Sequence, residues 1–212
     1  MSVFTTCPVA TALTNIPNAG CEFNMAQIQK LVFTRLYNTT GVLNGFDLTT
    51  KPPATLASWT PLLTAADNTK IVTSPFLQNP ALEAGAEKTF GGGNATLNGI
   101  PKSYGREASK FSGEFHSLKQ SVIEAIKKLQ TEELGVFMVN EFGQVFGLND
   151  TNTTPTKFLP IPIKSLFIQD LTGGGFESPD MNKFNFSLLP NWSDRLTGIV
   201  PTFDALTALN VA

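Results

Sequence analysis

The stretch "VFMVNEFGQVFGL", residues 136–148, limits the possible folds of this chain more than any other segment. Two short runs of β-branched and aromatic residues flank a turn at Glu141, Phe142 and Gly143, which is the pattern of a β-hairpin. Asn149 and Asp150 then open the next turn. The hairpin has neither a nucleophile nor a metal-ligand set, so its role is in the architecture or in a contact surface.

Other segments are also typical of strands, because they are rich in β-branched and aromatic residues and are bounded by turn residues. In "AQIQKLVFTRLY" the pattern leaves room for a switch of face near Gln29 and Lys30. Pro160 and Pro162 exclude a central strand at that point and indicate an edge or an extended segment. The segments 38–69 and 149–160 are loop-like, with a marginal helical turn at 57–63. The further predicted strands lie within 26–37, 70–74, 109–118, 165–171 and 183–189.

One segment, "SLKQSVIEAIKKLQTEELG", has the periodicity of an amphipathic helix. Ser117 and Gln120 have the spacing of a capping box, and Gly135 stands where a left-handed C-cap belongs. The prediction is an α+β, mainly β fold: a β-sandwich or small barrel with one packed helix over about 118–134. The predicted chain has an extended N-terminal arm (1–26), a single domain (27–200) with long loops, and a C-terminal tail (201–212).

The composition limits the partners of this 212-residue chain. Charged residues make up 15% of it, against about 25% in an average soluble domain. Such an uncharged surface favours burial against copies of the same chain over a monomer. The net charge of −2 comes without a basic stripe, which excludes nucleic-acid binding as the main task. The longest apolar stretch is far below the roughly 20 residues of a membrane span.

The residue types needed for chemistry are sparse. The single histidine, His116, is better explained as a strand–helix junction than as part of a triad. Cys7 and Cys21 are expected to be free thiols or a late-forming clip, since no secretory signal precedes them. No enzyme, cofactor or metal site is predicted. The acidic residues and glycine runs are explained as turns or solvated rims: Glu141, Asp150, Asp170, Glu177, Asp180, Asp194, 91–93 and 173–175.

The aromatic content is dominated by 17 phenylalanines, against two tyrosines and two tryptophans. Phenylalanine has no polar group, so it belongs in cores and dry contacts. A sugar-binding platform would more often use tryptophan and tyrosine. The aromatic content therefore favours assembly over ligand recognition.

Three stretches carry a resemblance: "CEFNMAQIQKLVFTRL", "GVFMVNEFGQVFGL" and "PIPIKSLFIQDLTGGGFESPDMNKFNFSLLPNWSDRL". Over about half of the chain, they resemble virion structural proteins of tailed phages and prophages of Bacteroidetes-type hosts. The layout of arm, sandwich, inserted helix and long loop resembles tail-tube subunits. The resemblance implies rings of identical subunits, made in the host cytoplasm and built into the virion. Other virion proteins would be partners, and DNA would pass through without specific binding.

Within that resemblance, the hairpin 136–148 is expected to pair its edge with a neighbouring subunit. The alternative functions are those of a neck or head-completion protein, a capsid decoration protein or a glycan-binding β-sandwich. A hydrolase ranks below these alternatives. The residues expected to contact other subunits are Trp59, Val136, Phe137, Met138, Val139, Phe142, Val145, Phe146, Phe176 and Trp192.

Overall fold

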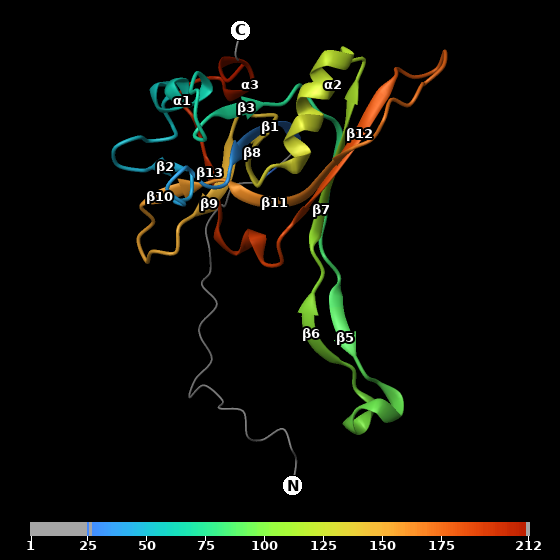
Figure 1. Cartoon of the computed structure of the whole chain (residues 1–212). Helices are drawn as coiled ribbons and strands as arrows, with labels where there is room; N and C mark the ends of the chain where they lie inside the picture. The colour runs from blue at the N-terminus through green and yellow to red at the C-terminus, as the bar shows by residue number, and fades with distance from the viewer. Residues whose placement is uncertain (1–24, 26, 211–212) are drawn as a thin grey trace.

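The computed structural model describes residue 25 and residues 27–210. The chain folds into a mainly β body from which a long β-hairpin projects (Figure 1). Eleven strands join one large bent sheet, β5 and β6 form a separate ribbon, and every strand pairing among the described residues is antiparallel. The predicted α+β, mainly β fold is confirmed. The arm predicted at 1–26 and both cysteines lie outside the described residues, Met25 excepted.

The elements follow the chain in order. The strands are β1 Ile28–Arg35, β2 Phe46–Asp47, β3 Ile71–Thr73, β4 Gln78–Glu83, β5 Glu87–Phe90, β6 Lys102–Arg106, β7 Ser109–His116, β8 Leu134–Asn140, β9 Val145–Asn149, β10 Lys157–Leu159, β11 Ile161–Ile168, β12 Met181–Leu188 and β13 Leu196–Ile199. The α-helices are α1 Leu56–Leu63, α2 Gln120–Lys127 and α3 Ala205–Ala208, and the 3₁₀ helices are η1 Gly93–Ala95, η2 Leu97–Gly99, η3 Lys128–Thr131 and η4 Trp192–Arg195.

Strand β8 lies at the centre of the sheet. One of its edges is paired with β1 along the whole strand, with a register shift between Ile28 and Lys30. The other edge is shared, because Met138 and Val139 pair with β9 while Gly135 and Val136 pair with β11. Strand β11 then leads into the second part of the sheet, in the order β11-β12-β7-β4. Side chains from both parts enter one core, as in a sandwich.

The continuous apolar runs of β1 and β8 follow from burial on both faces. Alternate side chains point to opposite faces of a strand. Leu31 and Val136 belong to the larger core, which also receives Phe111, Phe186 and Ile123 from β7, β12 and α2. The intervening Val32 and Phe137 belong to a smaller core on the opposite face. Neither strand therefore shows the polar alternation of a strand with one wet face.

The smaller core is built around aromatic side chains. The rings of Phe46 and Trp59 lie 4.3 Å apart, and those of Phe137 and Phe158 are stacked at 5.2 Å. The indole Nε1 of Trp59 donates to the Pro53 carbonyl oxygen at 2.7 Å, which satisfies the one polar atom of the buried ring. The segment predicted as loop-like, 38–69, thus supplies β2 and α1 to this core. Helix α1 also corrects the prediction of a single packed helix.

The C-terminal segment predicted as a tail also packs on the body. Ala205 and Leu209 are buried in the smaller core. The Lys30 ammonium, almost wholly buried, donates to the Leu206 carbonyl oxygen at 2.6 Å and to Asn210 Oδ1. Because these bonds join α3 to β1, residues up to Asn210 are part of the fold.

The predicted helix is present but shorter and capped differently. Helix α2 begins after Lys119, which serves as N-cap without a side-chain hydrogen bond, so the predicted capping box at Ser117 is wrong. Ser117 instead has a φ of 51°, and its backbone N–H donates to the Asp180 carbonyl oxygen at 2.9 Å. Gly135 is a buried residue of β8, where a Cβ atom would lie 2.7 Å from the Pro160 ring. This close approach, and not a helix cap, requires the glycine.

At the two prolines themselves the structure agrees with the predicted edge or extended segment: Pro160 lies between β10 and β11, and Pro162 is paired on one side only, with β8. The strand that follows nevertheless lies within the sheet. Strand β11 pairs with β8 on one side and with β12 on the other. The two pairings occupy successive parts of the strand: Ile161 and Pro162 face β8, and Ile163 onward face β12. Proline is tolerated because it lies where the ladder passes from one partner to the next, so no continuous row of N–H donors is needed there.

Candidate assembly surfaces

The hairpin 136–148 exists, but it offers no free edge. Strand β8 is paired on both sides, and β9 is flanked by β13 on one edge and by β8 and β10 on the other. The expectation that this edge pairs with a neighbouring subunit is therefore wrong. The structure places most of the residues predicted as contacts inside the core, where they are buried: Trp59, Val136, Phe137, Met138, Val139, Val145 and Phe146.

Three of the predicted contact residues remain accessible. Phe142 lies at the turn of the hairpin with 72% of its surface exposed, and Phe176 is fully exposed between β11 and β12. Trp192 is half-buried against the larger core. That core contains Val136, Met138 and Phe146, so the structure brings Trp192 together with three of the buried residues. The contact role of the three accessible residues stays a prediction.

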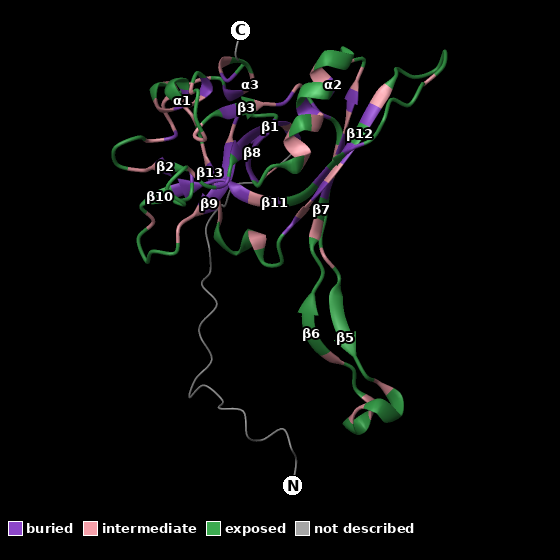
Figure 2. Cartoon of the chain, viewed as in Figure 1, coloured by how far each residue is buried: buried purple, intermediate pink, exposed green. Residues whose placement is uncertain are grey.

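The most exposed part of the fold is the hairpin of residues 84–108. From here on, "the arm" means this hairpin and not the N-terminal segment 1–26. It continues the β4–β7 pair beyond the body, as the Glu107 N–H donates to the Ala86 carbonyl oxygen at 2.8 Å between the two ladders. No residue from 81 to 108 is buried (Figure 2). An isolated two-stranded hairpin is marginally stable in water at best. The arm is therefore suited to contact something outside its own fold.

The arm carries apolar side chains that its own ribbon cannot bury. Phe90 and Tyr104 form an edge-on ring pair at 6.4 Å, and both remain more than half exposed. Leu97 and Ile100 are exposed at the tip. Exposed apolar groups gathered on one projection mark an interaction surface. The sequence predicted the turns of this segment but not that the segment projects from the body. A usable signal was present, because its short strands lack the alternation of apolar and polar residues that marks a strand with one buried face.

The tip of the arm has a defined shape. Gly91, Gly92 and Gly93 have φ values of 82°, 105° and 51°, in the region that favours glycine. The Thr96 hydroxyl accepts from the Gly92 N–H at 2.9 Å and donates to the Ile100 carbonyl oxygen at 2.8 Å. These bonds hold the apolar tip residues in a fixed arrangement, which lowers the entropy cost of binding.

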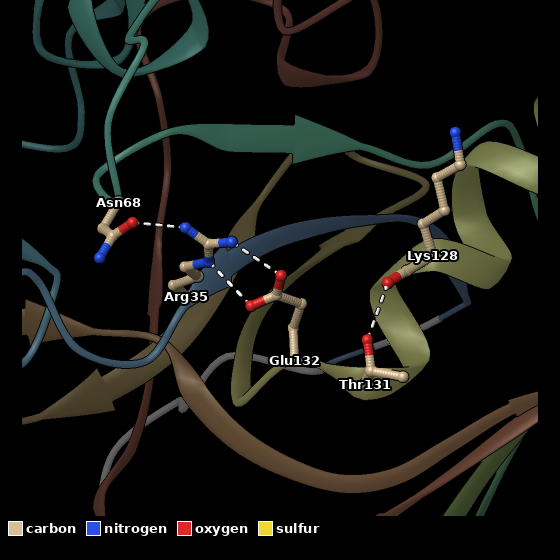
Figure 3. Close-up of polar contacts among 5 residues, drawn as sticks. All are labelled: Arg35, Asn68, Lys128, Thr131 and Glu132. Carbon is tan, nitrogen blue, oxygen red and sulfur yellow. Dashed lines mark hydrogen bonds and ion pairs between the residues drawn. The ribbon is translucent and has the colours of Figure 1, made fainter.

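A second surface feature is a groove on the body, between η3 and β3. Its polar rim is organised by Arg35, whose Nε and Nη2 donate to the two carboxylate oxygens of Glu132 at 2.9 and 2.7 Å (Figure 3). Arg35 Nη1 also donates to Asn68 Oδ1. The hydrogen bond from Arg35 holds the pKa of Glu132 below its usual range. A bidentate pair of this kind fixes the shape of the rim more than it stabilises the fold.

The single histidine lies in a small polar cluster on β7. His116 Nε2 is 3.1 Å from Glu114 Oε2, and Glu114 also accepts from Asn79 Nδ2 at 3.0 Å and pairs with Lys183 at 3.4 Å. The hydrogen bond with His116, helped by Asn79 and Lys183, holds the pKa of Glu114 below its usual range, against the opposing effect of burial. The imidazole is thus engaged by a carboxylate, and among the described residues no hydroxyl or thiol is hydrogen-bonded to it.

This cluster predicts an acid-dependent part of the stability. A carboxylate with a depressed folded pKa stabilises the fold above its unfolded pKa, about 4.3 for glutamate, and that stability is lost as the pH falls through the lower folded value. Glu114→Gln should therefore lose less stability than the wild type between about pH 5 and pH 3. Urea unfolding at several pH values measures the difference. Glu124→Gln, an exposed residue of α2, is the control, and equal acid sensitivity of Glu114→Gln and wild type would contradict the assignment.

Further properties follow from the described part of the chain. No group of three or more His, Cys, Asp or Glu residues there could hold a metal ion. None of its helices is long and apolar enough to cross a membrane. No protein-family model matches the sequence, and a comparison with curated proteins gives no match.

Proposed function

We propose that this protein is a non-enzymatic structural subunit that assembles with copies of itself into rings or tubes. The observation that carries the proposal is the arm: a continuation of two sheet strands, exposed throughout and tipped with apolar residues. Such a projection is costly to leave in water and is stabilised by docking on a partner. A copy of the chain is the partner that is always available at matching concentration.

The placement in a virion rests on the resemblance of the sequence to tailed-phage structural proteins. In that setting the subunit would form the tail tube, other virion proteins would bind its ends, and DNA would pass through it. The few charges of the chain, 15% of its residues with a net charge of −2, suit a lumen that does not hold DNA by its phosphates.

The first test is the mass of the purified full chain by light scattering over a range of concentrations, followed by negative-stain imaging of the same fractions. The expected result is a discrete multimer whose images show rings or striated tubes. A chain that stays monomeric at high concentration would overturn self-assembly as its own property. The function would then be that of a decoration protein, which needs a different partner to dock on.

A further inference from the structure

The loop between β11 and β12 presents one aromatic ring to solvent. Phe176 is at 111% of its reference exposure, so none of residues 27–210 covers it. The turn beneath it is ordered, since Gly174 N–H donates to Asp180 Oδ1 and Ser178 Oγ donates to the Gly174 carbonyl oxygen, both at 3.1 Å. A Cβ atom on Gly174 would lie 2.1 Å from the Ser178 carbonyl oxygen, so the turn depends on this glycine. The ordered turn therefore presents the ring to solvent at a defined place on the loop.

The groove between η3 and β3 is an apolar site of suitable size. It holds a cavity of about 200 Å³ that opens to solvent, with the buried side chains of Phe33 and Leu134 as its floor. Leu129 from η3 and Val72 from β3 form its walls. Val72 is the cross-strand partner of Phe33, yet it is 42% exposed. This edge of the core face is thus left open.

The charges on the two features are complementary. Of the two carboxylates at the groove, Glu132 is paired with Arg35, and Asp67 accepts from the backbone N–H and hydroxyl of Thr69 at 2.8 and 2.5 Å. Lys70 also lines the groove, is exposed and has no ion-pair partner within residues 27–210. Glu177, next to Phe176, is likewise exposed and unpaired there. The loop therefore offers an apolar ring, Phe176, next to the anionic Glu177. The groove offers an apolar cavity next to the cationic Lys70, so the two surfaces are complementary.

We propose that Phe176 of one copy inserts into this groove on a second copy, with Glu177 of the first copy pairing with Lys70 of the second. The inference rests on the proposed function and supplies one of its contacts. The tip of the arm is a poorer occupant, because residues 91–101 contain no charge to meet Lys70. Since the loop and the groove are different surfaces, the contact is heterologous and repeats from copy to copy, closing a ring or extending a filament.

The test is sedimentation velocity of the full chain with a charge-exchange set of variants. Phe176→Ala should weaken association at least about 30-fold, as expected for a central aromatic contact. Lys70→Glu and Glu177→Lys should each weaken it, and the double variant should restore it to near the wild-type value. Phe167→Ala removes an exposed phenylalanine of β11 that belongs neither to the loop nor to the lining of the groove. It is the matched control and should have no effect.

A mixing experiment tests the direction of the contact. Val72→Trp fills the groove but keeps the loop, and Phe176→Ala does the reverse. Each alone should assemble poorly, while a mixture of equal amounts should form heterodimers, because one intact loop then meets one intact groove. Assembly of Phe176→Ala equal to wild type, or failure of the double charge exchange to restore assembly, would overturn the contact but not the proposed function. A wild-type chain that is monomeric at every concentration would overturn the proposed function and the contact with it.

Discussion

A chain without its arm should fold normally and fail to assemble. The variant replaces residues 84–109 with Asn-Gly, which joins Glu83 to its cross-strand partner Lys110 through a two-residue hairpin turn. None of the removed residues is buried, so the free energy of unfolding should change by less than about 1 kcal/mol. Self-association should weaken by about 100-fold or more, because the apolar contacts of the arm are lost together. Light scattering and denaturant unfolding of the same samples measure both effects.

Point variants at the tip separate apolar contact from charge. Leu97→Asp should impair assembly strongly, since it places a carboxylate where an exposed leucine stood. Asn94→Asp adds the same charge nearby without removing an apolar group, and it should have a small effect. Wild-type assembly by the armless variant would show that the arm is not an assembly element. Loss of folding in that variant would mean that the arm belongs to the core structure, against its exposure.

The second large effect is expected at Phe137, in the middle of β8. Phe137→Ala should lower the free energy of unfolding by about 3–5 kcal/mol, since it removes a fully buried ring packed between Trp59 and Phe158. That is a large fraction of the roughly 5–15 kcal/mol that stabilises a typical domain. Urea unfolding in the armless background measures it without interference from assembly.

The control for Phe137 is Phe142→Ala, in the exposed turn of the same hairpin. It should change the free energy of unfolding by less than about 0.5 kcal/mol, as surface substitutions usually do. The comparison also decides between two roles for the hairpin. If Phe137→Ala left stability unchanged and abolished assembly, the hairpin would be a subunit contact, as the sequence pattern suggested, and its burial within one chain would be contradicted.

Local patterns in the sequence predicted where the strands lie better than they predicted which elements pack against each strand. The hairpin of β8 and β9 was identifiable because β-branched and aromatic runs flank a glycine-containing turn. An unbroken apolar run does not reveal whether it is covered by its own chain or by another copy, and here α1, α3 and the second part of the sheet cover it. Trp59 was named among the expected contacts in a segment that was predicted as loop-like, although its ring fills the smaller core.

The candidate surfaces were harder to predict for a related reason. A groove such as the one lined by Phe33, Val72 and Leu129 is made by segments far apart in sequence, and only the packing of η3 against β1 and β3 brings them together. The arm projects because, among the residues that the structure describes, no further strand pairs with the ribbon of β5 and β6 beyond β4 and β7. By contrast, Phe176 could be named from sequence, because an aromatic residue in a glycine-rich turn has little chance of burial.

The position of the arm gives each subunit a direction. It leaves the body on the side opposite to the β11–β12 loop, so that one subunit has two unlike faces (Figure 1). A stack in which arms reach onto the next layer is therefore polar, with free arms at one end and uncovered receiving surfaces at the other. Two different terminating proteins would be required to finish it, and growth would proceed at different rates from its two ends.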